Sequence, residues 1–108
     1  MIKATFTRDD NNHLTSVNIT GHAGSGEYGF DIVCASVSTL AINFVNSLEV
    51  LLDCPYDLDI NEIEGGYMNI SILQGNNGEK VQLLFESFLL GMTNLAQNSS
   101  EFVKTKVI

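Results

Sequence analysis

Two stretches of the sequence repeat their apolar residues at intervals of three and four, the period of a helix with one buried face. The first runs from near Cys34 to near Asp53, and the second from Val81 to about Asn98. Pro55 ends the first helix, because proline disfavours the helical conformation in the residue before it. The repeated positions are Val37, Leu40, Ala41, Phe44, Val45, Leu48 and Leu51, then Val81, Leu84, Phe85, Phe88, Leu89, Met92 and Leu95.

Alternating apolar and polar residues outside these helices predict strands. The apolar members are Ile2, Ala4 and Phe6; Val17 and Ile19; Leu58 and Ile60; and Met68, Ile70 and Ile72. Val103, Thr105 and Val107 finish the chain as a short strand. Turn residues at 9–12 and 65–66 make two hairpins of the first four strands. Each helix has one apolar face, which must be buried against the sheet. We therefore predict a two-layer α+β domain of order ββαββαβ with a mostly antiparallel sheet. A length of 108 residues makes 1–108 a single domain.

Residues 21–31 separate the second strand from the first helix and include four glycines. We therefore expect an irregular loop, whose entropic cost suggests a use for mobility. His22 and Cys34 lie at its two ends. A cysteine in the first turn of a helix lies near unpaired N–H groups, which stabilise a thiolate and could serve as an oxyanion hole. With His22 as general base this would be the pair of a cysteine hydrolase. Otherwise Cys34 is a small buried residue and His22 a polar loop residue.

Two further polar residues flank Cys34. Asp31 fits an N-cap that accepts the N–H of Val33 or Cys34, or else its carboxylate orients His22. A carboxylate beside a thiolate would also raise the pKa of the thiol, which favours the cap or another structural role in the loop. Ser38 lies one helical turn after Cys34, where its hydroxyl could bond the catalytic pair, the substrate or its own helix carbonyl.

A longer signature surrounds these residues. Gly21, His22 and Ala23, a glycine-rich spacer with Gly29, the run Asp31-Ile32-Val33-Cys34-Ala35 and then Ser38 resemble the ribosomal-processing cysteine protease family, Prp. The motif covers 21–38, and the rest of the chain agrees in length, element order and charge.

The resemblance implies that Cys34 is the nucleophile and His22 its base, with Gly21, Asp31 and Ser38 as further signature positions. It implies a homodimer that removes a short N-terminal extension, after an aromatic residue, from a large-subunit ribosomal protein, the twenty-seventh of the L series. Gly24, Gly26 and Gly29 then belong to a flexible flap that closes on substrate. Tyr28, Phe30 and Leu40 are candidate neighbours of the specificity pocket.

Composition limits the partners. Thirteen acidic against five basic residues give a net charge of −8, which suits a basic polypeptide substrate and disfavours direct nucleic acid binding. No signal peptide or membrane span is expected, so the cytoplasm is the expected location. His13, His22, Cys34 and Cys54 lack the close pairs of a zinc site, so we expect no metal and no cofactor.

Three other features have simpler interpretations. Gly24, Gly26 and Gly29 match a dinucleotide-binding pattern, but the preceding strand belongs to a hairpin and the helix starts too late. Cys54 ends a helix, where the dipole disfavours a thiolate, so we predict inert packing. His13 follows a hairpin turn and is expected to be solvated. The alternative function is a non-catalytic ribosome- or protein-binding module with a buried, unreactive Cys34.

Overall fold

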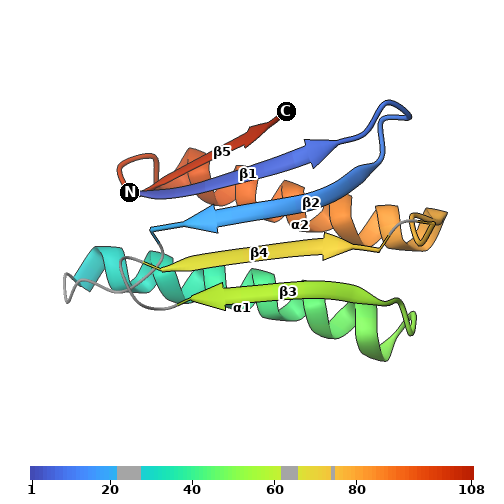
Figure 1. The fold of residues 1–108 in the computed structure, drawn as a ribbon. Helices are drawn as coiled ribbons and strands as arrows, with labels where there is room; N and C mark the ends of the chain where they lie inside the picture. The colour runs from blue at the N-terminus through green and yellow to red at the C-terminus, as the bar shows by residue number, and fades with distance from the viewer. Residues whose placement is uncertain (22–27, 62–65, 74) are drawn as a thin grey trace.

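The computed structural model describes residues 1–21, 28–61, 66–73 and 75–108. His22, Gly24 and Gly26 lie outside the described residues. In the described part of the chain the elements follow the predicted order ββαββαβ (Figure 1). They are β1 (Ile2–Arg8), β2 (Leu14–Thr20), α1 (Tyr28–Val50), β3 (Tyr56–Asn61), β4 (Tyr67–Ile72), α2 (Glu79–Asn98) and β5 (Val103–Val107).

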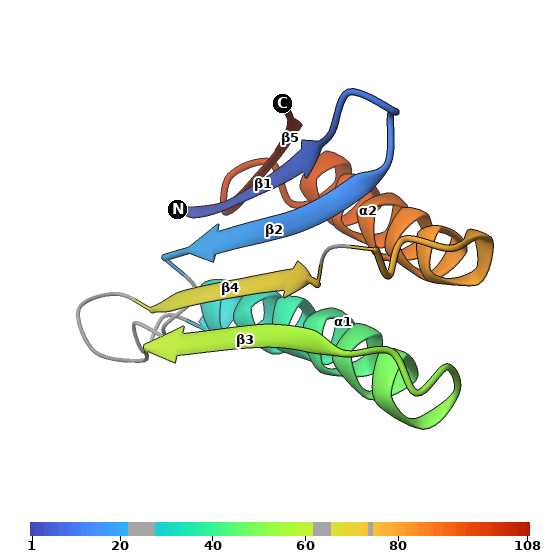
Figure 2. The ribbon, with the colours of Figure 1, turned by 45° about the vertical axis from the view of Figure 1, so that its right-hand side comes forward.

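The strands form one sheet in the order β3-β4-β2-β1-β5. Each neighbouring pair is antiparallel except β1 and β5, which are parallel. The register aligns Phe6 with Val17 and Val17 with Ile70, so apolar side chains of the three central strands share one face. Both helices cover that face, α1 behind β3 and β4 and α2 behind β1 and β2 (Figures 1 and 2). The predicted two-layer α+β architecture is confirmed.

Four phenylalanines join the two layers at the centre of the core. The ring of Phe44 on α1 lies 4.6 Å from Phe85 and 5.0 Å from Phe88 on α2, between ring centroids. Phe6 on β1 meets Phe88 edge to face at 5.4 Å. Such pairs contribute about 0.5–1.5 kcal/mol each beyond the apolar area they bury. The cluster therefore fixes both helices on the sheet.

The first helix starts earlier and ends sooner than the sequence predicts. It begins at Tyr28, so the prediction of an irregular segment at 21–31 is wrong for 28–31. The reason is that the buried stripe extends backwards: Phe30 and Val33 are buried at helical spacing, and Phe30 packs edge to face on Phe102 at 5.9 Å. The helix ends at Val50, which leaves Leu51, expected on the buried stripe, 70% exposed.

Helix α1 also meets a membrane-span test by length and composition. Its segment Gly29–Val50 has 22 residues and a mean hydropathy of 1.4, a run that the sequence analysis did not predict. The core helix of a soluble protein meets the same test. Here one face of α1 packs on the sheet and the opposite face carries Ser36, Thr39, Asn43 and Asn46.

Candidate active site

Cys34 lies in the second turn of α1, as the seventh residue of the helix. The prediction that it occupies the first turn is wrong, because the helix starts at Tyr28. Only the first four N–H groups of a helix lack partners inside it, and those belong to 28–31. The N-terminus of α1 therefore does not supply the expected oxyanion hole beside Cys34. The side chain belongs to the core and is only 7% exposed.

Asp31 and Ser38 lie on the same flank of α1 as Cys34. Their spacing of three and four residues brings the three side chains to one side of the helix. Asp31 is the fourth residue of the helix and stands in its first turn, so it is not the N-cap that one interpretation of the sequence expected. Ser38 is half-buried one turn further on. The structure thus brings together these three predicted residues.

Three groups near Cys34 act on the pKa of its thiol. Burial raises the pKa of Cys34, the carboxylate of Asp31 raises it further, and the positive α-amino group of Met1 lowers it in part. The expectation of a thiolate stabilised by the helix N-terminus is therefore wrong for the structure described. The expectation that a neighbouring carboxylate raises the pKa of this thiol is confirmed in direction.

Gly21 fixes the backbone at the end of β2, one residue before His22. Its φ of +78° lies in the left-handed region, and a Cβ there would collide with the backbone carbonyl of Met1. Its N–H donates to the carbonyl oxygen of Gly66 at 3.0 Å. Ile2, next to Met1, donates its N–H to the carbonyl oxygen of Phe102 at 2.7 Å. Two backbone bonds thus join Gly21 to Gly66 and Ile2 to Phe102 beside the end of β2.

Some predicted neighbours of the site have other roles. Gly29 is the second residue of α1, not part of a flap, and a Cβ there would lie 3.5 Å from the ring of Phe102. Phe30 belongs to the core. Leu40 faces Gly91 of α2, where a Cβ would approach its side chain to 3.0 Å. Phe30 and Leu40 therefore take part in core packing, and their place beside a specificity pocket stays a prediction.

Sequence reasoning missed Phe102. Its ring packs on Phe30 of α1, and its carbonyl oxygen accepts the N–H of Ile2 on β1. Phe102 therefore connects α1 with β1 at this end of the sheet. It precedes the last strand by one residue and fits neither the helical nor the alternating pattern. The sequence therefore offers no signal for its role.

Cys54 is as buried as Cys34, with 8% exposure, and burial raises the pKa of its thiol. Its Sγ lies 3.5 Å from the carbonyl oxygen of Pro55. The His13 side chain is 40% exposed, and its Nδ1 lies 2.9 Å from the Asn77 amide nitrogen. Among the described residues no group of three metal-binding side chains comes together.

The chain is similar to proteins of known activity. Residues 1–104 match the family described as cysteine protease Prp. The ribosomal processing cysteine protease Prp of Staphylococcus aureus is 32% identical over 104 residues, which cover 96% of each chain. The Bacillus subtilis protein of the same name is 34% identical over 101 residues, 91% of this chain and 89% of that protein.

Solved structures agree. A Streptococcus mutans crystal structure is 61% identical, with a TM-score of 0.95, and the match covers all of this chain and 94% of that one. Staphylococcus aureus Prp in complex with a substrate peptide is 29% identical over all of both chains, with a TM-score of 0.82. The same enzyme with a covalently linked product peptide gives 28% and 0.86. The chain belongs to the ribosomal-processing cysteine protease family, Prp.

Proposed function

We propose that this cysteine protease removes the short N-terminal extension of a large-subunit ribosomal protein, the twenty-seventh of the L series, with Cys34 as nucleophile and His22 as general base. The observation that carries the proposal is the position of Cys34. It lies between Asp31 and Ser38 on one flank of α1, at the end of the sheet where Gly21 leads to His22. The Staphylococcus aureus relative, solved with a covalently linked product peptide, supports covalent catalysis by a cysteine.

The chemistry follows from the state of the thiol. Because burial and Asp31 raise the pKa of Cys34, the side chain needs a base that takes its proton when substrate is bound. His22 then holds that proton as an imidazolium and stabilises the thiolate, which attacks the carbonyl carbon of the scissile bond. His22 next gives the proton to the leaving amine, and water hydrolyses the thioester. A raised pKa also lowers the reactivity of the thiol in the absence of substrate.

Asp31 has two possible contributions that an experiment separates. If it acts only on Cys34, then Asp31→Asn lowers the pKa of the thiol, speeds its alkylation at neutral pH and leaves cleavage unchanged or faster. If its carboxylate orients His22, the same variant alkylates faster but cleaves more slowly. We favour the second role, because Asp31 opposes thiolate formation at Cys34 and orientation of His22 would offset that effect.

The test is incubation of the extended ribosomal protein with wild type, Cys34→Ala, His22→Ala and, as a matched control, Cys54→Ala. Removal of a catalytic nucleophile or base typically lowers the rate by about 10³-fold or more. We expect such a loss for Cys34→Ala and His22→Ala, and wild-type cleavage for Cys54→Ala. Cleavage by Cys34→Ala at the wild-type rate would show that Cys34 is not the nucleophile.

The finer expectations belong to the same proposal. We propose a cytoplasmic homodimer whose partner is the basic ribosomal protein precursor, not a nucleic acid. The acidic surface supports this, since the net charge of −8 attracts a basic chain and repels phosphates. Sedimentation velocity gives the oligomeric state, and a single species with the mass of one chain would refute the dimer.

A further inference from the structure

A groove of about 230 Å³ separates α1 from the edge strand β3. Its lining is mostly apolar: Ala41, Ile42, Val45, Asn46, Tyr56, Leu58, Ile60 and Met68. We call this feature the α1–β3 groove. Three of its apolar side chains are open to solvent, with Ile42 55%, Leu58 41% and Ile60 47% exposed. The apolar residues Met68, Ile70 and Ile72 of the neighbouring strand β4 are buried, so α1 covers the side chains of β4 more completely than those of β3.

Strand β3 ends the described sheet and pairs only with β4 within it. The outer row of its backbone N–H and C=O groups therefore faces no other described strand, which makes the strand a template for an extended chain. The opposite edge, β5, has two exposed lysines, Lys104 and Lys106, a common protection against such pairing. On β3 the apolar side chains at the edge remain accessible.

The groove continues from the proposed nucleophile. Ser38 and Ile42 follow Cys34 at intervals of four residues, so all three lie along one flank of α1. On the sheet, Ile60 pairs with Met68, and the next register positions join Asn61 to Tyr67 and Tyr67 to Thr20. Thr20 immediately precedes Gly21. Asn61 on β3 and Thr20 on β2 thus lie at the same end of the sheet, so a peptide held on β3 would run toward the end where Gly21 leads to His22.

Charge selects the kind of peptide. Side chains alternate along β3, so Leu58 and Ile60 face the groove while Asp57 and Asp59 point to the uncovered face. A chain paired with β3 would place alternate residues beside these carboxylates, which favours lysine or arginine there. A second copy pairing through the same edge would bring an equal set of carboxylates close, at a cost.

We propose that the α1–β3 groove holds an extended, basic segment of the protein substrate as an added strand on β3, with its alternate apolar side chains in the groove. This rests on the proposed cleavage of a basic ribosomal protein. Leu58, Ile60 and Ile42 act as specificity residues, and Asp57 and Asp59 select basic side chains. The segment's backbone pairs with β3, and its alternating pattern distinguishes it from other basic chains.

Binding to the uncleaving Cys34→Ala protein tests the groove apart from catalysis. The probe is a short fluorescent peptide of alternating leucine and lysine, and the control peptide has the same composition in two blocks. We expect the alternating peptide to bind at least about ten-fold more tightly. Adding Ile60→Thr should weaken it about ten-fold, because a buried apolar contact is lost. Val107→Thr is the matched control, an apolar edge residue of β5 with 44% exposure, and should change nothing.

Backbone pairing has its own test. N-methylation of the peptide amides that face β3 should abolish binding, whereas methylation of the opposite row should not. Equal effects of Ile60→Thr and Val107→Thr, or equal effects of the two methylation patterns, would overturn the proposal. So would a change from dimer to monomer in Ile60→Thr alone by sedimentation, which would assign the groove to a second copy.

Cleavage separates this inference from the function on which it rests. With Cys34 intact, Ile60→Thr should raise KM for the ribosomal precursor several-fold and leave kcat and the alkylation rate of Cys34 unchanged. An unchanged KM would overturn the groove proposal while the assignment of Cys34 stands. Cleavage by Cys34→Ala at the wild-type rate would refute the role of Cys34 as nucleophile. The peptide-binding experiment alone would then decide whether the groove proposal holds.

Discussion

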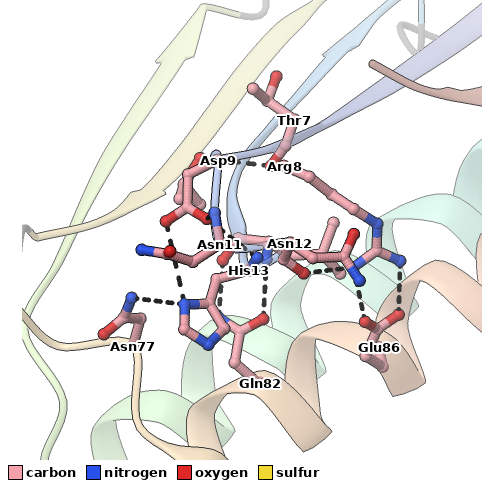
Figure 3. Close-up of polar contacts among 11 residues, drawn as sticks. Thr7, Arg8, Asp9, Asn11, Asn12, His13, Asn77, Gln82 and Glu86 are labelled. Atoms are coloured by element: carbon pink, nitrogen blue, oxygen red, sulfur yellow. Dashed lines mark hydrogen bonds and ion pairs between the residues drawn. The ribbon is translucent and has the colours of Figure 1, made fainter.

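The two ends of the sheet are held together by different interactions. At the end with the β1–β2 turn, polar side chains make the contacts (Figure 3). Gln82 of α2 accepts the Leu14 N–H at 2.7 Å and donates to the Leu14 carbonyl at 2.8 Å. Arg8 pairs with Glu86 through two contacts of 2.7 and 3.0 Å. We call this the hairpin end.

The other end, where β2 stops and α1 begins, depends on backbone bonds and rings. The N–H of Gly21 bonds to Gly66, that of Ile2 bonds to Phe102, and the ring of Phe102 packs on Phe30. We call this the Cys34 end. This end also carries the proposed nucleophile, Cys34. Substitutions at the Cys34 end should therefore change both stability and cleavage, and those at the hairpin end only stability.

The largest effect is expected for Gly21→Ala. The new Cβ would need a left-handed backbone and would collide with Met1, whose neighbour Ile2 is held by its bond to Phe102. We expect a loss of more than about 2 kcal/mol in the free energy of unfolding, together with a large loss of cleavage because His22 follows directly. Urea denaturation and the precursor assay measure the two.

Gly75→Ala is the matched control. Its φ of +87° is equally left-handed, but a Cβ there meets nothing within 4 Å. Only the backbone strain remains, about 1 kcal/mol, with cleavage unaffected. If the two variants lose equal stability, the close approach of Gly21 to Met1 makes no contribution to the loss of free energy of unfolding.

Much of the fold was predictable because it depends on periodic burial. The alternation in β1, β2 and β4 and the stripe of α2 each specify one face, and the structure buries that face. The packing of the two helices against each other was harder to predict from the sequence. Gly91 of α2 reads as an isolated glycine, yet it gives room to Leu40 of α1, a contact that only the assembled layers create. The start of α1 was not predicted because the glycines of 21–31 indicated an irregular loop, although Phe30 and Val33 extend the buried face of the helix.

For the site, the sequence indicated residue types but not their environment. The spacing of Asp31, Cys34 and Ser38 placed them on one flank once a helix was assumed. The state of the thiol could not follow from spacing, since it depends on how deeply Cys34 is buried. Burial and the Asp31 carboxylate raise the pKa of Cys34, opposite to the direction expected from a helix N-terminus. His22 lies outside the described residues, so its pairing with Cys34 stays a prediction.

A smaller effect is expected for Gln82→Ala at the hairpin end. The change leaves the N–H and C=O of Leu14 without their partner in a partly buried position, at a cost of about 1–2 kcal/mol. Gln97→Ala, an exposed position of the same helix, makes the same side-chain change and should cost almost nothing. Both should cleave the precursor at the wild-type rate. A loss of cleavage in Gln82→Ala beyond its loss of folded protein would contradict the separation of the two ends.

The smallest effect concerns the ion pair of Arg8 and Glu86. The hydrogen bond from Arg8 lowers the pKa of Glu86 below its ordinary value of 4.5, while Arg8 stays charged at every pH of interest. A carboxylate with a lowered pKa stabilises the fold above its unfolded pKa, and this contribution disappears as the pH falls through the folded pKa. Glu86 is 45% exposed, so solvent screening limits the effect to less than about 1 kcal/mol.

Glu86→Gln should therefore be less stable than wild type at pH 7, with a difference that shrinks as the pH falls below 4.5 through the folded pKa, and closer to wild type in high salt. Thermal unfolding at each pH measures the difference, and Glu101→Gln removes an exposed carboxylate elsewhere as a control. A difference that stays constant down to pH 3 would mean that the side chain acts through packing and not through its charge. Cleavage at pH 7 should be unchanged in both variants, because neither carboxylate lies on the α1 flank that holds Cys34.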